Sequence, residues 1–215
     1  HDHAPAMMHK TICMVAGEAS ADRHAAEVIH ALKAVSPDIE VFGIGGPRMK
    51  CEGMDCLYGI EEFSVMGFSD VIPRIRHIYS VYKGLMQIIK KRKPDLVVPI
   101  DLPDFNMYLA KKVKKSGIKV LYYIAPQAWA WRSYRANTLS RITDGLAVIF
   151  PFEESFFSSA GVNARFVGHP FMEHLSEVNQ QAAAWPPRDI LLLPGSRRHE
   201  IETMLPTMLA AKRII

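Results

Sequence analysis

Hydrophobic positions along the chain follow two different spacings, and the two spacings alternate. Short, nearly continuous apolar runs are typical of strands buried on both faces, and they predict strands at residues 11–17, 40–46, 95–100, 118–126 and 144–152. Apolar residues that recur every three or four positions predict helices at residues 20–35, 74–92, 106–117, 133–143 and 153–161. Strands and helices that alternate in this way favour right-handed βαβ units. The predicted fold class is therefore α/β, with a Rossmann-like doubly wound parallel sheet.

Two side chains stand where helix caps are expected. Ser20 precedes the first helical stretch and is a candidate N-cap, as is Asp104 after the apolar run at 95–100. The helix that follows Pro73 has apolar residues at helical spacing on one face. That face consists of Ile75, Ile78, Tyr79, Tyr82, Leu85, Met86 and Ile89.

Residues 172–188 interrupt the alternation with polar residues, alanines and adjacent prolines, a composition typical of a linker. Beyond it, residues 190–197 (ILLLPGSR) predict a further buried strand that runs into a Gly-Ser-Arg turn, and a helical stretch follows from His199. One strand and one helix cannot bury their own apolar faces. We therefore expect one domain at residues 9–171 and, at 189–215, only the beginning of a second, truncated domain.

Composition narrows the function classes. The chain has 215 residues, of which 49% are hydrophobic and 22% charged, as is ordinary for a globular protein. A formal net charge of +4 is too small to indicate nucleic acid, although it suits phosphate-bearing substrates or an anionic membrane surface. No apolar stretch reaches the roughly 20 residues of a membrane-spanning helix. An odd number of cysteines without a CxxC pair fits a reducing compartment, so we expect a cytoplasmic protein. Residues 1–8 show no periodicity, and we interpret them as a remnant added to the N-terminus.

The apolar run at 95–100 ends abruptly in polar residues: Asp101, then Asp104 and Asn106. In open parallel sheets the carboxyl ends of the strands face the crevice where ligands bind. A carboxylate held rigidly at the end of a central strand can act as a general base, so Asp101 is the candidate for that role. The alternative is that Asp101 only accepts hydrogen bonds from local backbone amides.

Further candidate binding residues lie at other strand ends. Glu18, Ser20 and Asp22 occupy the first β–α turn, where a helix N-terminus offers free N–H groups; their alternative role is to cap that helix. The glycine-rich segment GIGGPR at 43–48 indicates a tight turn rather than a dinucleotide loop.

Aromatic and basic groups add two more candidates. Gln127 stands beside Trp129 and Trp131, which could line a sugar site, although such aromatic residues are more often part of a core. The Gly195, Ser196 and Arg197 turn offers backbone amides and a guanidinium to a diphosphate; the alternative is an ordinary helix-start turn.

An apolar segment flanked by bases precedes and opens the helix after Pro73. Apolar residues beside Arg74, Arg76 and His77 suit contact with anionic lipid headgroups, although they could equally pack inward. The candidate membrane patch consists of Val65, Met66, Phe68, Val71 and Ile72.

Several of these segments, in their order along the chain, resemble the motifs of the lipid-A-disaccharide synthase family. They are VAGEASADRHAAEVIHALK, GIGGPRM, FSVMGFSDVIPRIRHI, IDLPDFN, YYIAPQAWAWRSYR, FPFEESFF, FVGHPF and LLPGSRRHEIE, and they extend from Val15 to about Ile201. The shared order is far more specific than any single motif. The resemblance implies an inverting glycosyltransferase with two facing Rossmann-like domains, the GT-B arrangement. It would join UDP-2,3-diacylglucosamine to 2,3-diacylglucosamine 1-phosphate and release UDP.

The resemblance also implies roles for parts of the chain. Residues 9–171 would form the acceptor-side domain, and 189–215 would begin the UDP-sugar domain, whose main nucleotide-binding segments would lie beyond Ile215. Asp101 would be the base, and the diphosphate would contact the turn at 195–197. The acceptor would contact Glu18, Ser20, Asp22, Asn106 and Gln127. The protein would attach peripherally to the inner face of the cytoplasmic membrane and would use no cofactor. We also expect no metal, because no DxD-like pair of acids follows a strand.

One residue departs from the family pattern. Ala21 stands where the family usually has glycine in its Glu-Ala-Ser-Gly-Asp loop. If the backbone there needs a positive φ, the methyl group would strain the loop by about 1 kcal/mol or more.

Two other functions remain open on the sequence alone. The first is a different UDP-sugar enzyme of the same architecture, an epimerase or another lipid-linked transferase. The second is a binding module that keeps the acceptor domain without catalysis. A requirement for an acylated sugar phosphate as acceptor distinguishes the first alternative from the synthase.

Overall fold

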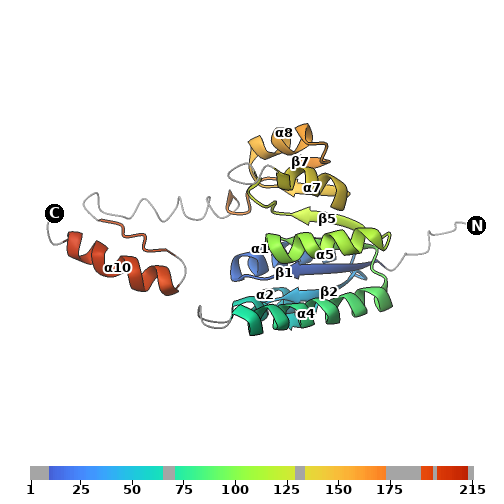
Figure 1. Cartoon of the computed structure of the whole chain (residues 1–215), viewed down its shortest axis with the longest axis horizontal. Coiled ribbons are helices and arrows are strands. Elements are labelled where there is room, and N and C mark those ends of the chain that lie inside the picture. Colours follow the sequence, from blue (N-terminus) through green and yellow to red (C-terminus); the bar gives the residue numbers. More distant parts are fainter. Residues whose placement is uncertain (1–9, 65–70, 129–133, 173–189, 196–197, 213–215) are drawn as a thin grey trace, which may run out of the picture. The chain divides into compact units, whose positions relative to one another are not determined.

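The strands form one parallel sheet with seven members in the order β3-β2-β1-β4-β5-β6-β7. The computed structural model, shown in Figure 1, describes residues 10–64, 71–128, 134–172, 190–195 and 198–212. The strands are β1 Thr11–Ala16, β2 Glu40–Gly45, β3 Asp55–Gly59, β4 Leu96–Ile100, β5 Lys119–Tyr123, β6 Gly145–Val148 and β7 Ala164–Phe166. The predicted doubly wound sheet is confirmed.

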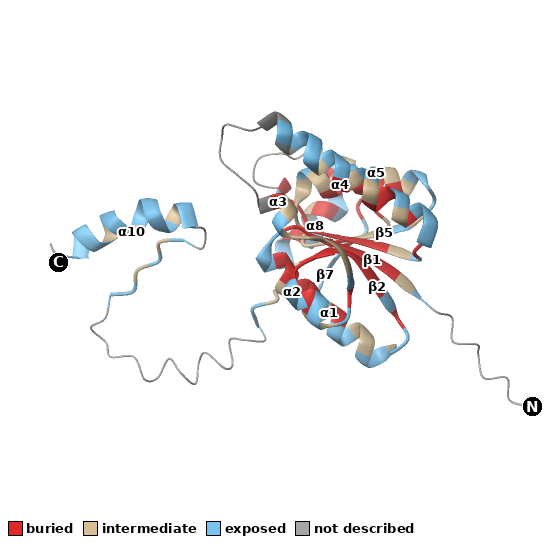
Figure 2. Ribbon diagram, turned by 90° about the horizontal axis from the view of Figure 1, so that it is seen from below, coloured by how far each residue is buried: buried red, intermediate tan, exposed pale blue. Residues whose placement is uncertain are grey.

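Helices cover both faces of the sheet. They are α1 Ala19–Val35, α2 Pro47–Cys51, α3 Glu61–Ser64, α4 Val71–Arg92, α5 Pro103–Lys115, α7 Tyr134–Ile142, α8 Pro151–Ser159 and, after the sheet, α10 Arg198–Lys212. Figure 2 shows α1 and α2 on one face and α4 and α5 on the other. Buried residues of α7 and α8, such as Leu139 and Phe157, belong to the same core as those of α4 and α5.

Alternation along the central strand β1 divides the core in two. Cys13 and Val15 pack beneath α4 and α5, whereas Met14 and Ala16 pack beneath α1. All four side chains are fully buried, as expected for a parallel strand covered on both faces. Burial raises the pKa of the Cys13 thiol far above its ordinary value, so Cys13 behaves as a small apolar core residue.

The sequence pattern missed four short elements. β3, β7, α2 and α3 were not predicted, because they have only three to five residues and, unlike the equally short β4 and β6, none of them is a continuous apolar run. The apolar face of α4 is only partly buried. Leu85 and Ile89 are fully buried, whereas Ile75 is 61% exposed and Tyr79 is 50% exposed.

The chain divides into two units, His1–Pro170 and Phe171–Ile215. The strand predicted at 190–197 is wrong for the residues that the structure describes. Residues 190–195 form no strand, and Ile190, Leu191 and Leu193 are exposed. A buried strand needs neighbouring strands to satisfy its backbone groups, and the described part of this unit contains none. The helix α10 follows with no buried residue.

None of the α-helices that the structure describes is both long and apolar enough to cross a membrane.

Candidate active site at the carboxyl edge of the sheet

Strands β1 and β4 meet at the point where the winding of the sheet reverses. From β1 the chain continues outward to β2 and β3, and from β4 it continues in the opposite direction to β5, β6 and β7. The register aligns Ala16 with Ile100 and Ile100 with Tyr123, so β1, β4 and β5 end at the same level. In doubly wound sheets ligands bind at this switch point, outside the carboxyl ends of the strands. The segments that follow these three strands therefore form the candidate site.

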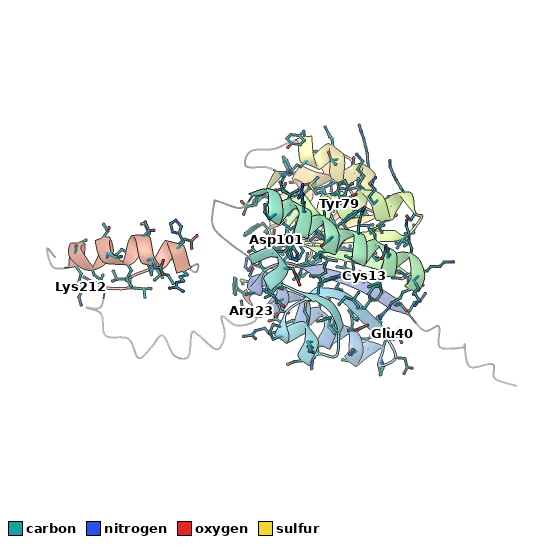
Figure 3. All side chains as sticks on the ribbon, turned by 60° about the horizontal axis from the view of Figure 1, so that its bottom comes forward. Cys13, Arg23, Glu40, Tyr79, Asp101 and Lys212 are labelled. Atoms are coloured by element: carbon teal, nitrogen blue, oxygen red, sulfur yellow. The ribbon has the colours of Figure 1, made fainter. Side chains whose placement is uncertain are left out.

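Asp101 lies at this edge, at the end of the sheet opposite to Glu40, which begins β2 (Figure 3). The backbone φ angles of Asp101, Leu102 and Ile124 are +50°, +46° and +58°. Left-handed backbone costs a non-glycine residue of the order of 1–3 kcal/mol, and the β-branched Ile124 is especially unusual there. Residues strained in this way persist only where their surroundings fix them, and they cluster at functional sites. The strain at two neighbouring strand ends points to the same edge as the topology does.

Hydrogen bonds hold the Asp101 backbone in this conformation. The amide of Asp101 donates to the carbonyl of Tyr123 at 3.2 Å. The carbonyl of Asp101 accepts from the hydroxyl of Tyr122 at 2.7 Å and from Nδ2 of Asn106 at 2.9 Å. Two buried side chains from β5 and α5 therefore fix the corner that carries the candidate base.

Asn106 has a different position from the one predicted for a residue that contacts the acceptor. It is completely buried, and its Nδ2 also lies 3.1 Å from the carbonyl of Ile100 and 3.3 Å from that of Val15. Only the amide nitrogen can face three carbonyl oxygens, so the orientation of the side chain is determined. Asn106 ties α5 to the ends of β1 and β4, and it can act on a ligand only through the Asp101 corner.

Tyr122 was not identified from the sequence, where it is one apolar residue of a strand. Burial, together with the nearby charge of Asp101, raises the pKa of Tyr122 well above its ordinary value. The hydroxyl therefore stays protonated at neutral pH and remains a hydrogen-bond donor to the Asp101 carbonyl.

Asp22 also departs from its predicted role in binding substrate. Its carboxylate is buried and accepts three backbone hydrogen bonds, from Gly46 at 2.8 Å, Met49 at 3.0 Å and Arg48 at 3.1 Å. These are N–H groups at the start of α2, so Asp22 caps that helix from α1. A Cβ atom at Gly46 would lie 2.5 Å from Oδ2 of Asp22, which explains the glycine. The glycine-rich segment is a turn built around this carboxylate.

The remaining residues of the first β–α turn correct two further expectations. The N-cap position of α1 is Glu18, without a side-chain cap, and Ser20 lies exposed inside the first turn, so the predicted cap at Ser20 is wrong. Ala21 lies within α1 and packs in the core beneath it. Its backbone is helical and needs no positive φ, so the methyl group at this position causes no strain.

Asp104 does not cap α5 as predicted. The N-cap is Leu102 and Pro103 is the first residue of the helix, which places Asp104 two positions after the cap. Its carboxylate instead pairs with Nη2 of Arg135 in α7 at 2.7 Å. The Asp104 side chain is 88% exposed and that of Arg135 only 12%, so the pair lies at the surface end of a mostly buried guanidinium.

Gln127 is exposed in the segment after β5, at the same edge as Asp101 and Glu18. Most of the other predicted site residues are not among the residues that the structure describes. Trp129, Trp131, Val65, Met66, Phe68, Ser196 and Arg197 lie outside the described residues, as do the side chains of Val71 and Ile72. Gly195 is described: it is exposed and has a φ of +108°, a value that favours glycine.

Two further features bear on the chemistry. Within the described residues no group of three or more His, Cys, Asp or Glu side chains could hold a metal ion. A cleft of about 510 Å³ opens at the amino edge of the sheet, on the far side from Asp101, between Thr11, Glu40, Asp55 and Arg92. Arg92 is already engaged there, paired with Asp55 at 2.5 Å and lying over the ring of Phe42. The topology, the strain and the polar groups favour the carboxyl edge instead.

Solved structures with a similar fold define the class of this protein. The UDP-GlcNAc 2-epimerase from Neisseria meningitidis, solved with UDP-GlcNAc bound, matches with a TM-score of 0.55 at 14% identity, over 81% of this chain and 50% of that one. A putative UDP-N-acetylglucosamine 2-epimerase from Listeria monocytogenes matches with a TM-score of 0.52 at 9% identity, over 78% and 50%. The fold is that of the first Rossmann-like domain of the GT-B type.

Sequence comparison gives the family. Residues 12–214 match the family described as lipid-A-disaccharide synthetase. The lipid-A-disaccharide synthase of Myxococcus xanthus is 46% identical over 94% of this chain, and that of Geobacter metallireducens is 40% identical over 96%. The chain belongs to the lipid-A-disaccharide synthase family. It spans about half the length of these relatives, 55% and 56%.

Proposed function

We propose that the complete protein is an inverting glycosyltransferase that joins UDP-2,3-diacylglucosamine to 2,3-diacylglucosamine 1-phosphate. The products are the β(1→6)-linked lipid A disaccharide 1-phosphate and UDP. The observation that carries the proposal is the corner at Asp101: a carboxylate at the switch point, on a strained backbone fixed by two buried donors, in a chain of this family. Residues 9–171 would bind the acceptor and 189–215 would begin the domain for the UDP-sugar.

In the proposed reaction Asp101 would act as the general base. Its carboxylate would take the proton from the 6-hydroxyl of the acceptor as that oxygen attacks the anomeric carbon. The new C1–O6 bond forms on one face of the donor sugar while the bond from C1 to the UDP oxygen breaks on the other, which inverts the configuration. The electron pair of the broken bond leaves with UDP, and the proton remains on Asp101.

Other residues would bind and orient the substrates. Glu18, Ser20 and Gln127 are exposed at the same edge and would contact the polar groups of the acceptor sugar. The turn at 195–197 would place backbone amides and the Arg197 guanidinium on the diphosphate. The patch at 65–72 would hold the protein on the cytoplasmic face of the membrane, where acylated substrates reside.

An assay with the full-length protein tests the proposal. Release of UDP from UDP-diacylglucosamine should require the acylated sugar phosphate and should yield a β-linked disaccharide. Conversion of the UDP-sugar alone would favour an epimerase, and binding of the acceptor without turnover would favour a binding module.

The same assay measures the metal requirement. We expect full activity in excess EDTA, because in this proposal a guanidinium and backbone amides balance the charge of the leaving diphosphate. Loss of activity in EDTA that magnesium restores would contradict this arrangement.

We expect Tyr122→Phe to lower kcat roughly tenfold in the full-length protein while leaving KM nearly unchanged. The substitution removes one of the two side-chain donors to the Asp101 carbonyl, and a small displacement of a catalytic group lowers the rate without weakening substrate binding. The matched control is Thr143→Val, which removes another buried hydroxyl that donates to a backbone carbonyl at 2.7 Å, away from the site. Equal losses of kcat in both variants would show that Tyr122 contributes only to stability.

A further inference from the structure

Helices α4 and α5 carry exposed aromatic and basic side chains on their outer surface, which Figure 2 shows to be largely exposed. Ile75, Tyr79 and Tyr108 are 61%, 50% and 46% exposed. We call this surface the aromatic–basic strip, and its members are Ile75, Tyr79, Tyr82 and Lys83 of α4 with Tyr108 and Lys112 of α5.

Contacts between the rings make the strip continuous across the two helices. Tyr79 stacks on Tyr82 with ring centroids 6.0 Å apart, and Tyr82 contacts Tyr108 of α5 at 4.9 Å. The ammonium of Lys83 lies 4.9 Å from the centre of the Tyr79 ring, and that of Lys112 lies 5.7 Å from the centre of the Tyr108 ring. Each exposed tyrosine therefore has a lysine above its ring.

The charge of the two helices has one sign. The sequence of α4 contains no acidic residue, and its last turn carries Lys90, Lys91 and Arg92, of which Arg92 is paired with Asp55 of β3. Helix α5 contains one acidic residue, Asp104, which is paired with Arg135. The surface around the exposed rings therefore presents positive charge that no acid on the same two helices neutralises.

We propose that the aromatic–basic strip lies against an anionic lipid bilayer. Tyrosine side chains are enriched at the depth of lipid headgroups, because one end of the ring is apolar and the other polar. Lysines beside them gain from the negative surface potential of such a membrane. The strip begins one turn after residues 71–72, which open α4 and belong to the predicted membrane patch, so the strip and the patch are adjacent along the sequence. The inference rests on the proposed function, because that function is the reason to expect a membrane near the protein. It adds which surface of the domain faces the membrane.

Vesicle binding by the full-length protein tests the proposal. Vesicles of phosphatidylcholine alone are compared with vesicles that contain phosphatidylglycerol. On the anionic vesicles, the double variant Lys83→Gln with Lys112→Gln should bind about 25-fold more weakly, because each lysine contributes about fivefold. The double variant Tyr79→Gln with Tyr108→Gln should bind roughly tenfold more weakly. A matched control, Val35→Gln with Lys50→Gln, changes exposed residues of α1 and α2 on the opposite face of the sheet and should alter binding less than twofold. Melting temperatures should change little, because Tyr79, Lys83 and Tyr108 are exposed and Lys112 is partly exposed.

Two more measurements separate this inference from the proposed function. Turnover of short-chain substrates without vesicles should be normal in the lysine and tyrosine variants. An inactive wild-type protein with the expected vesicle binding would overturn the proposed function and support the strip. Binding that is equal on neutral and anionic vesicles, or unaffected by the lysine pair, would overturn the strip. Tight binding of a single-stranded oligonucleotide through the same lysines would also overturn it, because aromatic and basic side chains together can bind nucleic acid as well.

Discussion

Asp101→Asn in the full-length protein should lower turnover by roughly 10²–10⁴-fold while substrate binding changes little. Asparagine keeps the size of the side chain and can still accept and donate hydrogen bonds, but it cannot take a proton from the acceptor hydroxyl. The backbone bonds that fix this corner involve the carbonyl and amide of residue 101, so the substitution leaves them in place. Steady-state kinetics with both substrates measures the effect.

Asp104→Asn is the matched control, three residues further on. Its carboxylate is mostly exposed and pairs with Arg135, and asparagine can still accept a hydrogen bond from that guanidinium. An exposed ion pair contributes about 0–1 kcal/mol, so turnover should stay within a few-fold of the wild type. Near-normal turnover for Asp101→Asn, or a larger loss for Asp104→Asn, would remove Asp101 from the role of base.

Asp22→Ala should destabilise the domain by about 3 kcal/mol or more and lower its melting temperature by roughly 10 °C. The substitution leaves the N–H groups of Gly46 and Met49 buried without an acceptor, and it removes a charge-assisted cap from α2. Thermal unfolding followed by circular dichroism measures the change.

Asp55→Ala serves as the control for charge removal. Asp55 pairs with Arg92 at a site where both side chains are substantially exposed, so its loss should cost no more than about 1 kcal/mol. If Asp22 held the substrate directly, Asp22→Ala would raise KM with an unchanged melting temperature. That result would contradict the assignment of Asp22 as a cap.

Much of the fold was predictable because its longer elements repeat a period. The apolar run before Asp101 and the helical spacing after Ser20 are signals within one element, and β4 and α1 appear where these signals place them. The prediction of a strand at 190–197 was wrong because it rested on an apolar run alone. An apolar run indicates burial but does not supply the partner strands that burial in a sheet requires.

The site was predictable only in part, since its main contacts join residues far apart in sequence. Asp101 could be proposed from its position at a strand end. The role of Asp22 depends on amides 24 to 27 residues away, and that of Tyr122 on a carbonyl 21 residues away. Local sequence rules assign such side chains to the nearest helix start, as they did wrongly for Ser20 and Asp104. The available signal for Tyr122 was a hydroxyl in a strand expected to be buried, because a buried hydroxyl must find a hydrogen-bond partner.

A crystal structure of the full-length protein with the acylated acceptor bound tests the central claim most directly. A general base must lie about 2.6–3.2 Å from the oxygen whose proton it takes. We expect the 6-hydroxyl of the acceptor within that distance of the Asp101 carboxylate, at the carboxyl edge beside Glu18 and Gln127. An acceptor bound in the cleft at the amino edge, or with its 6-hydroxyl turned away from Asp101, would contradict the account.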